Sequence, residues 1–500
     1  MSSNHLSRRR FIQLTAALAA AAPAVTACVP APGNNGGGAK GTVRYWDYWV
    51  SQSPWVKHEM KLFQAKYPKL TIDRTINQSG SYDNLFNLAE RSKNAPDVFI
   101  NTGTAVSFNA QVQKGWLMPL EKYADSDWVR QFPPYSFVEG NNVFGGKIYS
   151  APFTAPSVGL QLYINKKVFR DAGLTNADGS VKIPKTWDDV THYAEQITKK
   201  SNGSVYGLGF GNSSYDILAW WVGVLVPGTG SPYCVPGQPA STGGPDFRTG
   251  KYQFGSDRNY TDVLDLIMEW KNKGYFYPNS LSISDEVARV YFEHGKFGMT
   301  VGGVWNQPEW TDHKFTDYAV TSLVGPEEKP KAYYYSAPGG LLWAINADAG
   351  DPDAAWKWFS WLYGKDAGRR WVQDYNEDLS IYPDNNDPDH IKFTPFAQYV
   401  ALRTLVLPGP QPWVKNPETS NVVINPVNPG FGAIATGLYS GQVKNLGKAL
   451  TDLDGKLQDA LETGIKQATE KGHKVSIADY TFPDWDVAKP YKWSIPEYPT

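Results

Sequence analysis

The chain is poor in cysteine and nearly without net charge. It has two cysteines in 500 residues, Cys28 and Cys234, so at most one intramolecular disulfide is possible. This excludes a small disulfide-stabilised scaffold. The 48 Lys and Arg are balanced by 49 Asp and Glu. A nucleic-acid binder normally carries a basic excess, so the charge balance does not favour that class.

Long apolar runs and the common catalytic motifs are also missing. The longest apolar run, residues 217–226, is too short to cross a membrane and is typical of a buried element. There is no G-x-S-x-G elbow and no G-x-x-x-x-G-K-[ST] phosphate loop. The seven histidines are scattered, so we expect neither a metal nor a cofactor. A glycosidase needs only two carboxylates, however, and the 49 acidic residues leave that alternative open.

The N-terminal segment has the layout of an export signal. Residues 7–13 (SRRRFIQ) resemble a twin-arginine motif and precede a short apolar stretch. Residues 25–28 (VTAC) resemble a bacterial lipobox, in which Cys28 would become the lipid-carrying first residue. We therefore predict an export signal over 1–27 and a flexible tether over 28–41, which is rich in Pro and Gly. The body is then extracytoplasmic and anchored to the outer face of the cell membrane.

The body shows an alternation of strand and helix patterns. Residues 42–46 form an apolar-rich strand, and Ser53 with Pro54 offers a helix start. The order strand, helix, strand, helix, strand over residues 42–100 predicts an α/β fold on a largely parallel sheet. Thr186 and Asp351 each offer a helix cap. A leucine-rich stripe over residues 446–465 predicts a long amphipathic helix that packs on the core.

Seven short segments, in order along the chain, resemble one family. It is the carbohydrate-binding group of extracellular solute-binding proteins of ABC importers, the group that contains maltose-binding protein. The segments are 43–49 (VRYWDYW), 94–98 (NAPDV), 115–120 (GWLMPL), 163–174 (YINK…AGL), 184–189 (PKTWDD), 295–305 (GKFGMTVGGVW) and 339–345 (GGLLWAI). Each segment is weak alone, but their common order over more than 300 residues makes the resemblance specific.

The resemblance implies a two-lobed α/β fold of the periplasmic-binding-protein type, with a ligand held between the lobes by hinge closure. It places the crossings between the lobes near 152–155, 338–342 and Pro395. The first lobe would comprise residues 42–152 and 342–395, and the second 153–341 and 396–480. Residues 481–500 would form a C-terminal extension.

Aromatic residues are abundant, and several are candidates for ligand contact. The chain has 19 Trp, 29 Tyr and 22 Phe, and flat rings with a polar edge suit the C–H faces of sugars. Trp49 follows the first strand, where ligands meet α/β sheets. Trp305 aligns with a tryptophan that stacks on ligand in the family, and Trp220 is preferred over its neighbour Trp221. Tyr215 lies with Trp220 and Trp221 in a region that varies among relatives and is a further candidate. The family alignment adds Asn101 and Thr104 and, as weaker candidates, Gln78 and Phe431.

These observations predict a binding protein and not an enzyme. By resemblance, a monomeric, lipid-anchored receptor would capture a sugar, most naturally an oligosaccharide, and deliver it to the membrane permease subunits of an ABC importer. No nucleic acid is expected as a partner. Two alternatives stay open: a secreted glycosidase, and a receptor for a glycerol phosphodiester or another polar solute.

Overall fold

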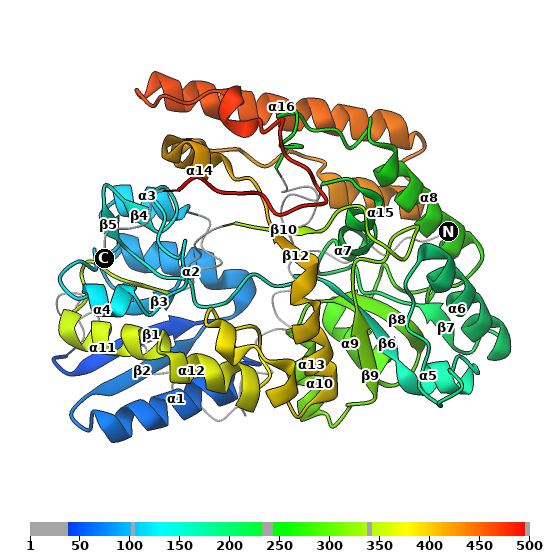
Figure 1. Cartoon of the computed structure of the whole chain (residues 1–500), viewed down its shortest axis with the longest axis horizontal. Coiled ribbons are helices and arrows are strands. Elements are labelled where there is room, and N and C mark those ends of the chain that lie inside the picture. Colours follow the sequence, from blue (N-terminus) through cyan, green and yellow to red (C-terminus); the bar gives the residue numbers. More distant parts are fainter. Residues whose placement is uncertain (1–38, 102–105, 233–243, 338–342, 496–500) are drawn as a thin grey trace, which may run out of the picture.

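The protein folds into two α/β lobes, each built on a four-stranded sheet, and a long C-terminal helix lies above both (Figure 1). The computed structural model describes residues 39–101, 106–232, 244–337 and 343–495. Cys28, Thr104, Cys234 and the predicted crossing at 338–342 lie outside these ranges. The α/β fold class and the two-lobed architecture predicted from the sequence are confirmed.

The first lobe contains the sheet with strand order β11-β3-β1-β2. Strands β1 (Thr42–Asp47), β2 (Thr71–Ile76) and β3 (Val98–Ile100) are parallel, and β11 (Trp343–Ile345) runs antiparallel to β3. The helices of this lobe are α1 (Ser53–Lys66), α2 (Ser79–Arg91), α3 (Phe108–Gln113), α4 (Ser126–Val129), α11 (Pro352–Leu362) and α12 (Lys365–Arg369). The lobe also contains a hairpin of β4 (Val143–Phe144) and β5 (Lys147–Ile148). The predicted strand and helix order over residues 42–100 is confirmed.

The second lobe contains the sheet with strand order β7-β8-β6-β9. Strands β7 (Tyr206–Leu208) and β8 (Phe297–Gly302) are parallel. Strand β6 (Gln161–Asn165) is antiparallel to both β8 and β9 (Tyr318–Thr321). The helices of this lobe are α5 (Lys166–Asp171), α6 (Trp187–Lys200), α7 (Ile217–Leu225), α8 (Arg258–Asn272), α9 (Asp285–Glu293), α10 (Asn306–Asp312) and α13 (Thr394–Ala401).

The C-terminal part adds a third group of elements. Strands β10 (Tyr334–Ser336) and β12 (Val406–Pro408) pair in parallel, and the helices are α14 (Pro412–Lys415), α15 (Phe431–Ser440) and α16 (Leu446–Glu470). In α16, Leu450, Leu453, Leu457 and Leu461 are buried. This confirms the predicted amphipathic helix, whose stripe belongs to the core. Residues from the C-terminal extension pack here too, because Phe482 and Trp485 are buried.

Helix caps follow the sequence signals closely. Thr186 makes the predicted capping box at the start of α6, and the Asp351 side chain accepts a hydrogen bond from the Ala354 N–H in α11. Ser53 behaves differently, because Gln52 occupies the N-cap position and Ser53 is the first helical residue of α1. The Ser53 hydroxyl accepts a hydrogen bond from Arg74 instead.

The first predicted crossing meets another segment that runs between the lobes. Thr154 forms an antiparallel bridge with Ser380, and the Ile381 N–H donates to the Phe153 carbonyl over 2.9 Å. Further along, Pro395 lies in the first turn of α13, which packs on β9 of the second lobe. The boundaries given above for the lobes stay a prediction.

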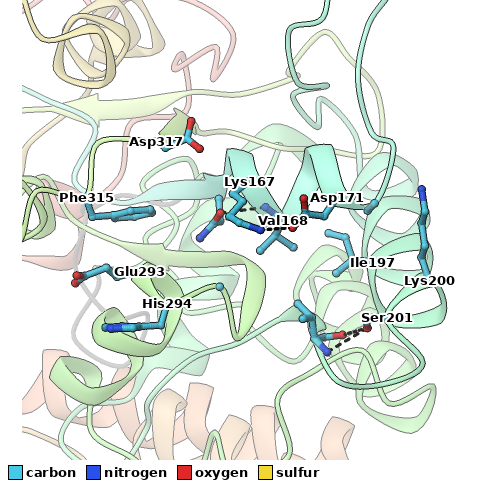
Figure 2. A pocket seen from close by; sticks show the side chains of 14 residues that line it. Lys167, Val168, Asp171, Ile197, Lys200, Ser201, Glu293, His294, Phe315 and Asp317 are labelled. Atoms are coloured by element: carbon cyan, nitrogen blue, oxygen red, sulfur yellow. Dashed lines mark hydrogen bonds and ion pairs between the residues drawn. The ribbon is translucent and has the colours of Figure 1, made fainter.

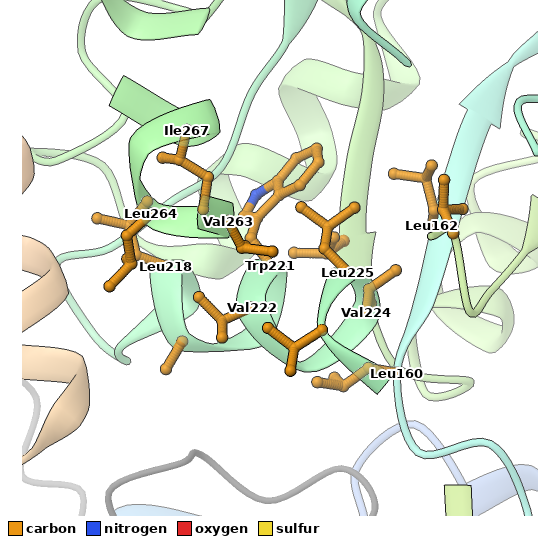
Figure 3. Close-up of a cluster of buried hydrophobic side chains, with 14 of the residues drawn as sticks. Leu160, Leu162, Leu218, Trp221, Val222, Val224, Leu225, Val263, Leu264 and Ile267 are labelled. Carbon is orange, nitrogen blue, oxygen red and sulfur yellow. The ribbon is translucent and has the colours of Figure 1, made fainter. Parts of the chain in front are cut away.

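The core of the second lobe explains the longest apolar run of the sequence. Every residue of α7 except Trp220 is buried. Figure 3 shows Trp221, Val222 and Leu225 of α7 packed among side chains of α8 and β6. The run is therefore a buried element, as its length indicated, and the structure shows that it is a helix.

Candidate ligand-binding site

Three of the predicted ligand-contacting residues come together in the second lobe. The rings of Tyr215 and Trp220 are stacked with centroids 6.1 Å apart, and Trp305 meets Trp220 edge-on at 5.8 Å. Tyr215 is 50% exposed and Trp305 36% exposed, which is unusual for large aromatic side chains. We call Tyr215, Trp220 and Trp305 the aromatic cluster. It presents flat apolar rings with polar edges to the outside.

The backbone before Trp305 explains how its ring is held. Trp305 follows β8 and precedes α10, and its ring lies directly on Gly303. A Cβ atom at Gly303 would come within 2.0 Å of the indole, so only glycine permits this ring position. The Gly303 carbonyl accepts a hydrogen bond from the Tyr163 hydroxyl over 2.8 Å, which fixes the backbone beneath the ring.

We expect Gly303→Ala to weaken ligand binding about tenfold or more, because the added methyl group displaces the Trp305 ring. The fold should survive, since the backbone at Gly303 does not need a positive φ. Calorimetric titration with the best-binding sugar measures the effect. Gly455→Ala is the matched control, because a Cβ atom there meets nothing within 4 Å. Equal affinity of both variants and wild type would show that Gly303 does not position the ring.

The carboxyl edge of the first sheet holds three further predicted residues. Because β1, β2 and β3 are parallel, their carboxyl ends lie at one edge. Trp49 follows β1, the exposed Gln78 follows β2, and Asn101 follows β3. Asn101 is buried and its Nδ2 donates to Gln111 Oε1 over 2.8 Å. These residues line the same edge of the first sheet.

Trp49 is half-buried in an aromatic group of the first lobe. Its ring stacks on Trp371 with centroids 5.1 Å apart, and it meets Trp343 edge-on at 5.4 Å. The loop that carries it is held by Arg74, which donates to the Trp49 carbonyl over 2.8 Å. Arg74 also forms a buried ion pair with Asp47 at 2.7 Å. Burial raises the pKa of Asp47, although the guanidinium of Arg74 opposes the shift.

Phe431 is placed differently from the expectation. Its side chain is fully buried and packs against Phe254 at 5.3 Å and Tyr260 at 6.1 Å. A ligand cannot reach a ring in this position, so the burial does not support a contact. Thr104 and Cys28 lie outside the described residues.

The carboxyl group of Glu377, near Trp49, was not predicted from the sequence. Glu377 is only 4% exposed, and its Oε2 has no hydrogen-bond partner among the described residues. Burial raises the pKa of Glu377 well above its usual value, although a side-chain hydrogen bond with Gln52 opposes the shift. It follows the π-helical turn Arg370–Asp374 and the left-handed Asn376, features common at functional sites. No motif in the sequence marks this residue.

A surface pocket of about 590 Å³ lies elsewhere on the second lobe. Figure 2 shows Lys167, Asp171, Lys200 and His294 around it. It sits where β6 ends and β8 begins, whereas Trp305 follows the other end of β8. Lys167 and Asp171 pair with each other at 2.6 Å. The pocket is therefore separate from the aromatic cluster.

No helix in the described ranges is both long and apolar enough to cross a bilayer. Within the same ranges, no group of three or more His, Cys, Asp or Glu side chains is arranged to hold a metal ion.

Solved structures of sugar receptors share this fold. The GacH receptor of Streptomyces glaucescens, studied with acarbose, is 17% identical, with a TM-score of 0.62 over 85% of this chain and 99% of that one. Maltose-bound MalE3 of T. maritima is 16% identical, with a TM-score of 0.61 over 84% and 100%. MalE of Bdellovibrio bacteriovorus bound to maltotriose is 15% identical, with a TM-score of 0.57 over 85% and 100%.

A search of curated protein sequences gives no significant match. The family model described as bacterial extracellular solute-binding protein matches residues 17–369, well over half of the chain. This agrees with the resemblance carried by the seven sequence segments. The chain therefore belongs to the bacterial extracellular solute-binding protein family.

Proposed function

We propose that this protein is a receptor that captures a sugar, of oligosaccharide size, between its two lobes and delivers it to an ABC importer. The observation that carries the proposal is the exposed aromatic cluster of Tyr215, Trp220 and Trp305. Rings with this exposure offer apolar faces to the C–H surfaces of a pyranose and polar edges to its hydroxyls. Structures of the same fold carry acarbose, maltose and maltotriose, which supports this ligand class.

The first lobe supplies hydrogen-bonding groups for the other side of the ligand. Asn101, Gln78 and Glu377 lie near the strand ends or near Trp49, and Glu377 has an oxygen without a partner in the described protein. A sugar hydroxyl would satisfy such an oxygen, because a buried acceptor without a donor is costly. Closure of the lobes would then bring these groups to the ligand and present both lobes to the permease.

The charges near the aromatic cluster favour a neutral ligand over a phosphodiester. Arg289 of α9 lies next to Asn306, which follows Trp305. Its guanidinium is already matched by three carboxylates, Asp285, Glu286 and Glu309, at 3.0–3.7 Å. A phosphate would have to compete with these acids, whereas an uncharged sugar would not.

Calorimetric titration of the purified protein against mono- and oligosaccharides and glycerol phosphodiesters tests the proposal. We expect saturable one-to-one binding of a sugar, which mass analysis recovers intact. Recovery of sugar fragments would show that the protein is a glycosidase. If the protein binds a phosphodiester but no sugar, the proposed ligand class is wrong and the proposed receptor role still stands.

We further propose that Cys28 carries the lipid that anchors the protein outside the cell. Cys28→Ala should shift the protein from the membrane fraction to the soluble or secreted fraction, because one hydrophobic anchor is lost. Cell fractionation with immunoblotting measures this. Cys234→Ala is the matched control and should stay with the membrane. Membrane retention of the Cys28 variant would contradict the lipid anchor.

A further inference from the structure

A segment of the C-terminal part is hydrogen-bonded to the first lobe. The segment is residues 416–430, and it begins with Asn416 and the 3-10 turn Pro417–Asn421. Asn421 Oδ1 accepts hydrogen bonds from Asn109 Nδ2 over 2.8 Å and from Gln113 Nε2 over 2.6 Å. Both donors belong to α3, more than 300 residues earlier in the chain. Asn421 therefore joins the C-terminal part of the chain to the first lobe.

The other end of the segment is fixed to the second lobe. Residue 430 leads directly into α15, which packs on α7. Gly432 lies so close to Asp216 that a Cβ atom would come within 2.3 Å of its carboxylate. Asn212 Nδ2 donates to Thr436 Oγ1 over 2.9 Å. The segment thus ends beside Tyr215.

Two prolines and helix α16 restrain the segment. Pro426 and Pro429 restrict its backbone. Helix α16 lies behind it: a Cβ atom at Gly464 would come within 2.5 Å of the Val423 carbonyl, and Lys456 Nζ donates to the Asn428 carbonyl over 2.9 Å. Figure 1 shows α14 above α3 on one side, α15 beside α7 on the other, and α16 running over both.

Both attachment points adjoin predicted ligand contacts. Helix α3 begins a few residues after Asn101, and the Asn101 side chain donates to Gln111 of that helix. On the other side the attachment flanks Tyr215 of the aromatic cluster. The segment is therefore a link between the lobes that is independent of the crossings at 153–154 and 380–381.

We propose that residues 416–430 form a strap that borders the ligand site and must release Asn421 from α3 before the lobes can open fully. The part that concerns the ligand rests on the proposed sugar-binding function. Asn109 Nδ2 also donates to Ser420 Oγ over 3.2 Å, so three neutral hydrogen bonds join the segment to α3. They are strong enough to bias an opening equilibrium and weak enough to break during exchange. The strap thereby sets the rate at which ligand is released.

Asn421→Ala tests the strap, because it removes the shared acceptor and leaves the proline-containing segment intact. We expect a larger radius of gyration in small-angle X-ray scattering of the ligand-free protein and about tenfold faster sugar release in stopped-flow fluorescence. Asn176→Ala is the matched control, since its hydrogen bond to Ser180 at 3.0 Å stays within the second lobe. The joint variant Asn109→Ala/Gln113→Ala also removes the hydrogen bond from Asn109 to Ser420, so its effect should be at least as large as that of Asn421→Ala.

Two outcomes separate the strap from the proposed function. An unchanged radius of gyration and unchanged release in both a folded Asn421→Ala and a folded Asn109→Ala/Gln113→Ala protein would overturn the strap, even if wild type binds sugar well. Absence of sugar binding by wild type would overturn the proposed ligand. The scattering comparison would still decide whether the strap holds the lobes, because it needs no ligand.

Discussion

Trp305→Ala is expected to weaken sugar binding by about 100-fold or more, because a tryptophan that stacks on its ligand supplies a large share of the binding energy. The loss should appear in the calorimetric dissociation constant. Stability should change little by comparison, since Trp305 is 36% exposed and contacts its neighbours mainly through Trp220 and Gly303. Thermal unfolding of the same sample separates the two effects.

Trp116→Ala provides the matched control for this result. Trp116 is also half-buried, but its carbonyl accepts a hydrogen bond from the Ala347 N–H. Ala347 follows β11, whose end lies beside the amino end of β3. This position is at the edge of the first sheet opposite Trp49 and Asn101. The control should therefore bind sugar like wild type. Wild-type affinity in Trp305→Ala would reject the aromatic cluster as the ligand site.

The largest loss of stability is expected from Arg74→Ala. Arg74 is 5% exposed and Asp47 fully buried, and two hydrogen bonds of 2.7 and 2.9 Å join them. Removing the guanidinium leaves a buried carboxylate without its cation, which costs about 3–5 kcal/mol. The Trp49 carbonyl and the Ser53 hydroxyl lose a donor as well. Chemical denaturation should show the decrease in the free energy of unfolding.

An exposed ion pair is the proper comparison for Arg74. Lys167 and Asp171 are 2.6 Å apart but largely exposed, so Lys167→Ala should leave the unfolding midpoint unchanged within error. The double variant Arg74→Ala/Asp47→Asn should recover part of the loss, because it removes the unpaired charge. A decrease in Arg74→Ala no larger than that in Lys167→Ala would show that the buried pair does not stabilise the first lobe.

The fold was largely predictable because its signals are local. Apolar spacing, caps such as Thr186 and the length of residues 217–226 each depend on neighbouring residues. The structure contains the expected helix after Thr186 and the expected buried element at 217–226. The buried pairing of Arg74 with Asp47 was not predictable, since the two residues are 27 positions apart and nothing in the sequence links them. The same holds for Asn421 and α3.

The candidate site was predictable only in part. Trp305 and Trp220 each lie at a position that the family alignment or the local sequence singled out, and the structure brings them into contact. Phe431 was proposed from an alignment blurred by gaps, and it packs in the core instead. Glu377 could not be found at all, because what distinguishes it is burial without a partner for Oε2, which only the folded chain reveals.

Adjacent tryptophans of α7 illustrate how this protein could evolve. Trp221 is fully buried in the core, whereas its neighbour Trp220 turns outward to the aromatic cluster. Selection for folding acts on Trp221, and selection for the ligand would act on Trp220. Successive side chains of a helix point about 100° apart. Selection for folding and selection for the ligand therefore act on two different residues, although these are neighbours in the chain. A lineage could therefore exchange residue 220 and acquire a new nutrient while its core stays unchanged.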